Sequence, residues 1–177
     1  GEDLIIVSIN QPYWIPYLGY FALIASTDKF VVLDSVKFSR RSWVARNFLY
    51  NGDKPVWNSI PLQSASQNSR IMDLQMESSN RWKNRTLSTL RHSFKLTKTN
   101  TPVFEMVESW FSSEELNLSK FLTKTLNDMC LGLGIRTEFV PSDTLVLPER
   151  HEFSGQERII EICKRLGAHS YVNLPSG

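Results

Sequence analysis

The sequence predicts an α/β fold with a mostly parallel sheet and a helical insert. A strand, a helix and a second strand follow one another within residues 4–34, and a helix and a strand fill residues 154–174. Short apolar runs rich in β-branched residues, typical of strands buried on both faces, alternate with amphipathic segments. This alternation favours an α/β class. We expect one domain over residues 1–177, with residues 80–133 as a helical insert or layer within it.

The first predicted unit is a βαβ crossover. Residues 4–9, LIIVSI, form a continuous apolar run, and residues 17–26 are apolar all round, as an inner-layer helix is. Residues 29–34, KFVVLD, repeat the strand pattern. Two strands joined by a helix in about thirty residues are parallel, with a right-handed crossover. The sheet is therefore expected to be Rossmann-like.

The remaining helices and strands are predicted from the spacing of apolar residues, from helix-capping residues and from prolines and glycines that end an element. Pro102 stands at a first helical position, Ser154 and Glu157 have capping-box spacing, and Gly167 ends a helical stripe. We expect strands at 56–62 and 69–77, helices at 80–96, 101–111 and 118–133, a strand at 136–141, a helix at 154–167 and a strand at 170–174.

Composition is that of an ordinary globular chain. Hydrophobic residues make up 41% and charged residues 21%, with a net charge of +2. No apolar run approaches the ~20 residues of a membrane span. Cys130 and Cys163 fall on apolar faces of predicted helices, so we expect buried reduced thiols and a cytoplasmic location.

Several functional classes lack their sequence patterns. His92, His151 and His169 are scattered, and no ligand spacing for a metal is present. There is no phosphate-binding glycine loop and no nucleophile elbow. The pattern specifies no cofactor and no metal.

An unusual loop follows the first predicted strand. Residues 9–21, INQPYWIPYLGYF, concentrate aromatic residues and prolines where a simple connector would do. Ligands of parallel sheets bind beyond the carboxyl ends of the strands. We therefore expect Gln11, Tyr13, Tyr17 and Tyr20 to contribute to a site. The alternative is that the prolines stiffen the turn and the aromatic rings belong to the core.

A second unusual segment follows the second predicted strand. Residues 34–47, DSVKFSRRSWVARN, begin with Asp34 and continue with basic and aromatic residues, and no acid occurs from Ser35 to Gly52. Arginine forks match phosphate or carboxylate groups. The expected ligand-binding residues here are Arg40, Arg41, Trp43, Arg46 and Asn47. Asp34 is a candidate general base, or it simply pairs with an arginine.

Other predicted strand ends add Ser142 and Asn173 as substrate-binding candidates. Since both segments described above follow strands of one parallel unit, we expect all these residues to meet on one rim of the sheet.

The chain resembles the WbqC-like family. Residues 9–47, with the stretch INQPYWIPYLGYFALIASTDKFVVLDSVKFSRRSWVARN, resemble its signature, and residues 155–177, GQERIIEICKRLGAHSYVNLPSG, resemble its second block. The resemblance implies a role in O-antigen, lipopolysaccharide or other surface-polysaccharide biosynthesis, on activated sugars. Asn10, Ser35 and Lys37 depart from the usual family residues. Family members usually continue further, so the chain is expected to be shortened at its C-terminus.

Residues 17–20, YLGY, occupy the place of the HxGH signature of nucleotidylyltransferases, which implies a nucleotidylyltransferase-like sheet. Tyrosine donates a hydrogen bond but cannot carry the charge of an imidazolium, so nucleotidyl transfer by that route would be impaired. This analogy bears on the fold alone.

The sequence thus predicts a cytoplasmic transferase that moves a small group to or from a nucleotide-activated sugar, with Asp34 and Gln11 as catalytic residues. The alternative is a non-catalytic module that binds the nucleotide sugar or serves as a scaffold in the same pathway. Nucleic-acid binding ranks third, because there is one basic cluster and the pI is only about 8.6. The expected partner is a small molecule, not a nucleic acid or a membrane.

Overall fold

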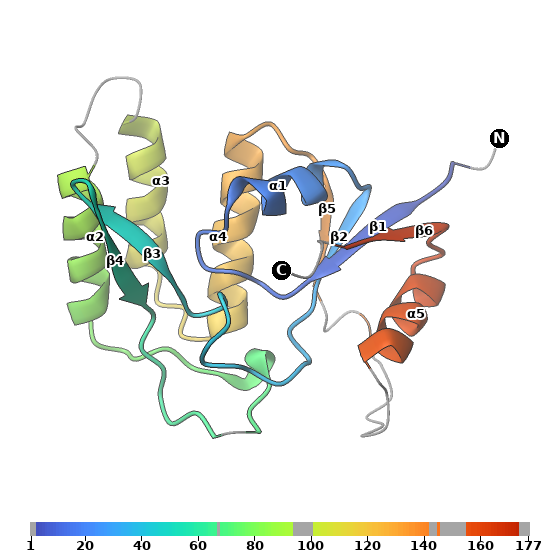
Figure 1. Ribbon diagram of the computed structural model, residues 1–177, viewed down its shortest axis with the longest axis horizontal. Coiled ribbons are helices and arrows are strands. Elements are labelled where there is room, and N and C mark those ends of the chain that lie inside the picture. Colours follow the sequence, from blue (N-terminus) through green and yellow to red (C-terminus); the bar gives the residue numbers. More distant parts are fainter. Residues whose placement is uncertain (1–2, 67, 94–100, 142–144, 146–154, 174–177) are drawn as a thin grey trace.

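The computed structural model describes residues 3–66, 68–93, 101–141, 145 and 155–173. Figure 1 shows the parallel strands gathered at one end of the molecule and a β-hairpin at the other, with helix α4 between them. The helices and strands lie close to the predicted ranges, except for strand β3 (Arg46–Asn51), which was not predicted, and residues 69–77, which form no strand.

The larger sheet is parallel throughout. Its strands are β1 (Ile6–Asn10), β2 (Lys29–Val32), β5 (Glu138–Val140) and β6 (Ser170–Val172), in the order β5-β2-β1-β6. Val7 pairs with Lys29 and Tyr171, and Phe30 pairs with Phe139. The α/β class and the parallel first unit are therefore confirmed.

Helices cover both faces of this sheet. Side chains of a strand point alternately to its two faces. On one face α1 (Leu18–Ala25) and α4 (Leu118–Gly132) pack against Phe30 and Val32. On the other, Ile162 of α5 (Gly155–Arg165) packs against Val7 and Val31. The predicted cap of α5, Ser154, lies outside the described residues.

A second core lies on the far side of α4. It is built around Trp14, which is fully buried, and includes Trp82 of α2 (Arg81–Ser93) and Trp110 of α3 (Thr101–Ser112). Phe121 of α4 packs against Trp14, with ring centroids 5.7 Å apart. The helices predicted between residues 80 and 133 are all present, and α4 is shared by the two cores.

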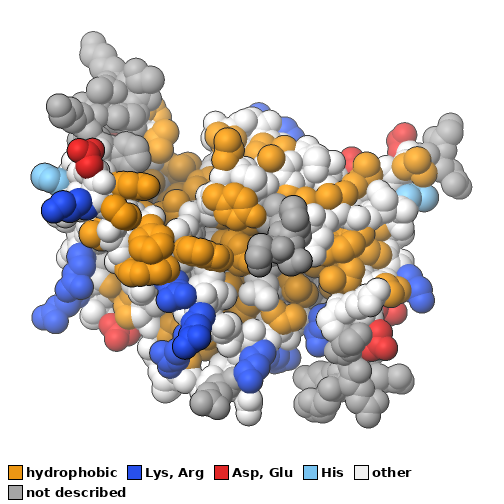
Figure 2. Space-filling view, viewed as in Figure 1, with side chains coloured by type: hydrophobic (Ala, Val, Ile, Leu, Met, Phe, Trp, Pro, Cys, Tyr) orange, Lys and Arg blue, Asp and Glu red, His pale blue; other side chains and the backbone are white. Residues whose placement is uncertain are grey.

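The hairpin consists of β3 (Arg46–Asn51) and β4 (Lys54–Ser59). The prediction of a strand at 56–62 located β4 approximately and missed β3. A two-residue turn joins the strands, and Gly52 has φ of +64° there, a conformation that glycine adopts freely. Figure 2 shows hydrophobic side chains gathered over this hairpin.

The prediction of a strand at 69–77 is wrong. Residues 71–73 form a 3-10 helix, η1 (Ile71–Asp73), flanked by single β-bridges. The backbone N–H groups of Ile71 and Met72 donate to the carbonyls of Val36 and Asp34. These bonds tie the segment to the loop after β2, so it joins no regular ladder.

Candidate ligand site at the carboxyl edge of the sheet

The carboxyl ends of the four parallel strands form one edge. In sheet order, the residues that follow the strands are Pro141 after β5, Asp34 after β2, Gln11 after β1 and Asn173 after β6. The order of the strands reverses between β1 and β6, which is where open α/β sheets form their ligand crevice. Ser142, the candidate after β5, lies outside the described residues.

A cleft of about 520 Å³ opens beyond β2 and β5, against one side of α4. Its volume falls in the range of small-molecule sites, about 300–1,000 Å³. Most of its polar lining comes from α4 and the residue before it. The polar lining residues are Asp34, Asn117, Ser119, Lys120, Thr123, Lys124, Asn127 and Asp128.

Asp34 is held in place at the floor of this cleft. Only 9% of the residue is exposed, and its Oδ2 accepts a hydrogen bond of 2.5 Å from the hydroxyl of Ser119. Its backbone carbonyl accepts from the N–H of Met72 at 2.8 Å. A carboxylate oriented in this way from two elements of the fold presents a defined geometry to a ligand.

The N-terminus of α4 brings positive charge to the cleft. Asn117 caps the helix: its side chain accepts from the N–H of Lys120 at 3.0 Å and donates to the carbonyl of Met72 at 2.9 Å. Lys120 and Lys124, one turn apart, both line the cleft, and Lys124 also pairs with Asp128 at 2.8 Å. Helix dipole and ammonium groups together favour an anion.

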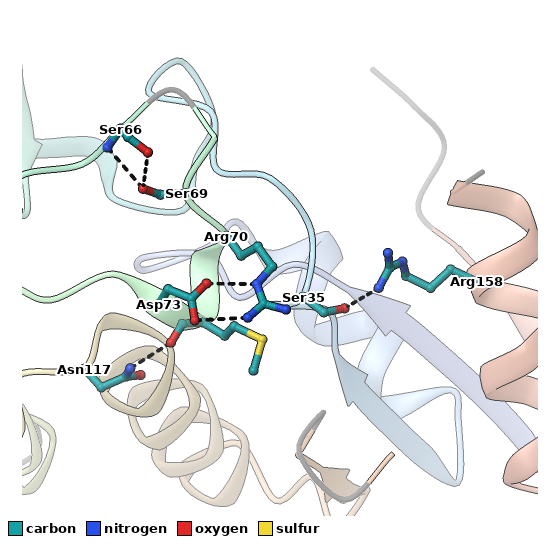
Figure 3. A network of polar contacts seen from close by, with 8 residues as sticks. Ser35, Ser66, Ser69, Arg70, Asp73, Asn117 and Arg158 are labelled. Carbon is teal, nitrogen blue, oxygen red and sulfur yellow. Dashed lines mark hydrogen bonds and ion pairs between the residues drawn. The ribbon is translucent and has the colours of Figure 1, made fainter. Parts of the chain in front are cut away.

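An arginine from the second sequence block reaches the same edge. Figure 3 shows Arg158 of α5 extending to the loop after β2, where it donates to the hydroxyl of Ser35 at 3.0 Å. Arg70 lies beside this loop, since it forms a β-bridge with Lys37, and its guanidinium binds Asp73 at 2.8 and 3.3 Å. Arg158 and Ser35, which are 123 positions apart in the sequence, thus meet next to Asp34.

The loop after β1 divides between the surface and the core. Tyr20 is fully buried, and its hydroxyl donates to the carbonyl of Gln11 at 2.6 Å. Tyr13 is half-buried and packs on Tyr20, with ring centroids 5.2 Å apart. Burial, with the neighbouring Tyr13, raises the pKa of Tyr20 well above its ordinary value. Tyr20, expected to bind substrate, is enclosed by protein in this structure and fixes the backbone of Gln11.

Tyr17 is 57% exposed and begins the YLGY stretch. A Cβ atom on Gly19 would lie 2.7 Å from the Tyr17 ring, so the ring packs over this glycine and would have to move for a larger residue.

The predicted arginine cluster lies on the hairpin and its approach. Arg46 stacks over the Trp57 ring at 4.6 Å and donates to the carbonyl of Arg41 at 2.8 Å. Trp43 is 43% exposed. Arg40 is exposed and donates to a backbone carbonyl at 3.5 Å. Among the described residues that line the cleft, none comes from positions 37–47.

Asn47 serves the loop after β1. Its side-chain amide donates to the carbonyls of Trp14 and Ile15, at 3.1 and 2.6 Å. Ile15 has φ of +45°, a strained value for a β-branched residue. The N–H of Trp14 also donates to the carbonyl of Trp43. The two unusual segments do meet, but Asn47 and these backbone contacts stabilise the loop.

Several residues of the edge escaped the sequence reasoning. Ser119, Lys120 and Lys124 stood in a helix analysed only for its apolar face, although Asn117 with lysines three and seven positions later was a visible sign of a capped, basic helix start. Arg158 had no such sign, because its contact with Ser35 depends on tertiary structure alone.

The cysteines are free thiols. Cys130 is buried in α4, and burial raises its pKa to about 11. Across the described residues no three His, Cys, Asp or Glu side chains group as metal ligands would. None of the described helices has the length and hydropathy to cross a membrane.

Comparisons with known proteins place this geometry in context. The model of the WbqC-like protein family matches residues 11–177. "Uncharacterized protein Rv1507c" of Mycobacterium tuberculosis (strain ATCC 25618 / H37Rv) is 26% identical over 172 residues, which cover 96% of this chain and 72% of that protein. No solved structure matches the chain.

Proposed function

Because the chain belongs to the WbqC-like protein family, we propose that it is a cytoplasmic enzyme of surface-polysaccharide (O-antigen) biosynthesis that transfers a small group to or from a nucleotide-activated sugar. The observation that carries the reaction part of this proposal is the cleft at the carboxyl edge. It combines a buried carboxylate, Asp34, with two lysines of α4, Lys120 in the first turn and Lys124 in the second. The two free cysteines suit a reducing compartment.

The cleft is lined by two lysines, Lys120 and Lys124, and two carboxylates, Asp34 and Asp128, and the lysines suit a phosphorylated ligand. Lys120 and Lys124 would bind phosphate oxygens, and the dipole of α4 favours an anion near its start. A cleft of about 520 Å³ accommodates a sugar with its phosphates rather than a polymer. Arg158, half-buried and bonded to Ser35, stands at the same edge and has further N–H donors for a second phosphate.

Asp34 is the proposed general base. A base must lie within hydrogen-bonding reach of the proton that it removes, and its geometry must be fixed. The hydrogen bond from the Ser119 hydroxyl orients the carboxylate of Asp34, which would accept the proton of an attacking hydroxyl or amine. Gln11, whose backbone is fixed by Tyr20, would orient the same group from the neighbouring strand.

The sheet supports a Rossmann-like assignment. Numbered along the chain, its four strands lie in the order third, second, first, fourth, as in the first part of the doubly wound order. In such folds a nucleotide lies at the switch point, which here falls between β1 and β6, at Gln11 and Asn173. The nucleotide would then extend along the edge from these residues toward the cleft.

A non-catalytic binding module is the second candidate. The contacts of Asp34 with Ser119 and Met72 also suit a carboxylate that only joins β2, η1 and α4. In that case nucleotide sugars would bind and remain unchanged.

Titration calorimetry with nucleotide sugars, ATP, CTP and acetyl-CoA tests the proposal. Nucleotide sugars are expected to bind, and Lys120→Met or Lys124→Met to weaken this binding roughly tenfold, the value of a charge-assisted hydrogen bond. Lys164→Met on the exposed side of α5 is the matched control, with no expected change. Binding that both cleft variants leave intact would overturn the site.

Asp34→Asn separates the two candidates. Under the enzyme proposal this variant keeps ligand affinity within a few-fold and loses turnover, followed by mass spectrometry of the sugar product. Under the module proposal the unaltered protein already shows no product. An Asp34→Asn variant that turns over normally would exclude Asp34 as the base.

A further inference from the structure

The outer face of the hairpin carries exposed aromatic rings. Phe48 and Trp57 lie opposite each other in register, with ring centroids 3.8 Å apart, and remain 42% and 51% exposed. Tyr50, next on the same face of β3, is 60% exposed. The inner face does the packing, since Leu49 is buried against Leu90 and Phe104. The hairpin therefore docks on the protein without the outer rings.

Trp43 and Arg46 extend this face into a continuous surface. Trp43 stacks on Trp57 with centroids 5.9 Å apart and an interplanar angle of 26°. The guanidinium of Arg46 covers another part of the Trp57 ring at 4.6 Å. We call this surface the aromatic platform; its members are Trp43, Arg46, Phe48, Tyr50 and Trp57.

The charge next to the platform is positive. Arg40 and Arg41 are exposed just before Trp43, and no acid occurs from Ser35 to Gly52. Figure 2 shows basic side chains bordering the hydrophobic ones over the hairpin. In a symmetric pairing of two copies through this face, like charges would lie opposite each other, which disfavours self-association. An anionic partner is favoured instead.

The shape and charge density narrow the class of ligand. The rings of the platform contact one another, and their exposed parts form one apolar surface, which suits a chain-like ligand with several units. A nucleic-acid strand carries a charge on every unit and is bound by broad basic stripes. This chain has a net charge of only +2 and offers two exposed arginines here. A ligand with sparser charges fits better.

We propose that the aromatic platform binds a carbohydrate chain that carries carboxylate or phosphate groups. The C–H groups of sugar rings are weakly positive and apolar, and they would contact the exposed parts of the indole rings of Trp43 and Trp57. The acidic groups pair with the forks of Arg40 and Arg41. This site is separate from the cleft and does not depend on the function proposed for it.

Tryptophan fluorescence reports directly on this site. Of the five tryptophans, Trp14, Trp82 and Trp110 are buried, so a surface ligand changes the emission of Trp43 and Trp57. The probes are a glucuronate-containing hexasaccharide, a neutral glucose hexasaccharide and a single-stranded deoxythymidine decamer. The acidic hexasaccharide is expected to shift the emission at the lowest concentration.

Variants identify the residues responsible. Trp57→Ala, and Arg40→Ala with Arg41→Ala, are expected to weaken binding of the acidic hexasaccharide roughly tenfold, equivalent to about 1.4 kcal/mol. Leu133→Ala and Arg136→Ala, which remove exposed side chains just before β5, are matched controls. Thermal melting checks that each variant is folded. If Trp57→Ala does not fold, Trp57→Phe takes its place.

Three results would overturn the proposal. The first is acidic-hexasaccharide affinity unchanged in the platform variants. The second is tighter binding of the deoxythymidine strand than of the hexasaccharide, which would assign the platform to nucleic acid. The third is self-association, seen by light scattering, that Trp57→Ala abolishes.

Discussion

Tyr20→Phe tests whether the loop after β1 is held in place as described. The substitution removes one atom, the hydroxyl oxygen that donates to the carbonyl of Gln11 at 2.6 Å. The ring remains, and with it the packing on Tyr13, Phe21 and Phe30 at centroid distances of 5.2, 6.1 and 5.8 Å. The change is therefore confined to one hydrogen bond in a fully buried position.

The expected cost follows from that geometry. Gln11 is half-buried, so the loss of this hydrogen bond should cost about 0.5–1.5 kcal/mol. In a domain of this size, each kcal/mol lowers the melting temperature by roughly 2–4 °C. Urea denaturation should show a lower midpoint with an unchanged slope, because the same surface is exposed on unfolding.

Tyr17→Phe is the matched control. Tyr17 is 57% exposed, so removal of its hydroxyl should change stability by less than about 0.5 kcal/mol. Equal midpoints for Tyr20→Phe and the unaltered protein would refute the buried hydrogen bond. They would also remove the argument that Tyr20 positions Gln11 at the carboxyl edge.

Three further predictions concern stability and reactivity. Burial raises the pKa of Tyr20 in the folded state, so the contribution of this group to stability should be full below about pH 10, the pKa in the unfolded chain, and should fall as pH rises above it. Tyr20→Phe should reduce this loss of stability in urea denaturation at pH 9–11. An equally steep loss in the variant would contradict the assignment. Asn47→Ala removes the donor to the carbonyls of Trp14 and Ile15 and should lower the free energy of unfolding by about 1–3 kcal/mol, measured by urea denaturation. The control Asn51→Ala, at an exposed position, should lower it by less than about 0.5 kcal/mol. Similar urea midpoints for the two variants would show that Asn47 does not stabilise the loop after β1. Cys130 has a pKa of about 11 and is 1% exposed, so its reaction with a thiol reagent at pH 8 should be limited by local unfolding. It should therefore react more slowly than the half-buried Cys163. Faster modification of Cys130 would show that its side chain is not buried.

The sequence was sufficient for the elements whose signals are local. The βαβ unit and the helices followed from apolar period and caps, and the parallel sheet placed Asp34 and Gln11 at one edge. The strand β3 was missed because residues 34–47 were interpreted as one basic and aromatic ligand-binding segment, which overlaps its start. The Gly52-Asp53 pair between β3 and β4 is a two-residue hairpin signal that could have located it.

The composition of the candidate site was less accessible from sequence. An aromatic residue at this junction gives no sign of whether it is buried: Tyr20 in α1 is enclosed, whereas Tyr17, just before α1, is exposed. Arg158 and Ser119 contact the loop after β2 across 123 and 85 positions, and such contacts arise only from the packing of α5 and α4 on the sheet. The rim predicted as one site therefore divides into a cleft and a separate hairpin surface.

Hydrogen-exchange mass spectrometry with a bound nucleotide sugar tests the central claim most directly. The account predicts slower exchange in residues 117–124, where the start of α4 lines the cleft, and in residues 33–36 after β2. The hairpin, residues 46–59, should be unchanged. Protection confined to the hairpin, with no change at the start of α4, would contradict the assignment of the cleft as the nucleotide-sugar site.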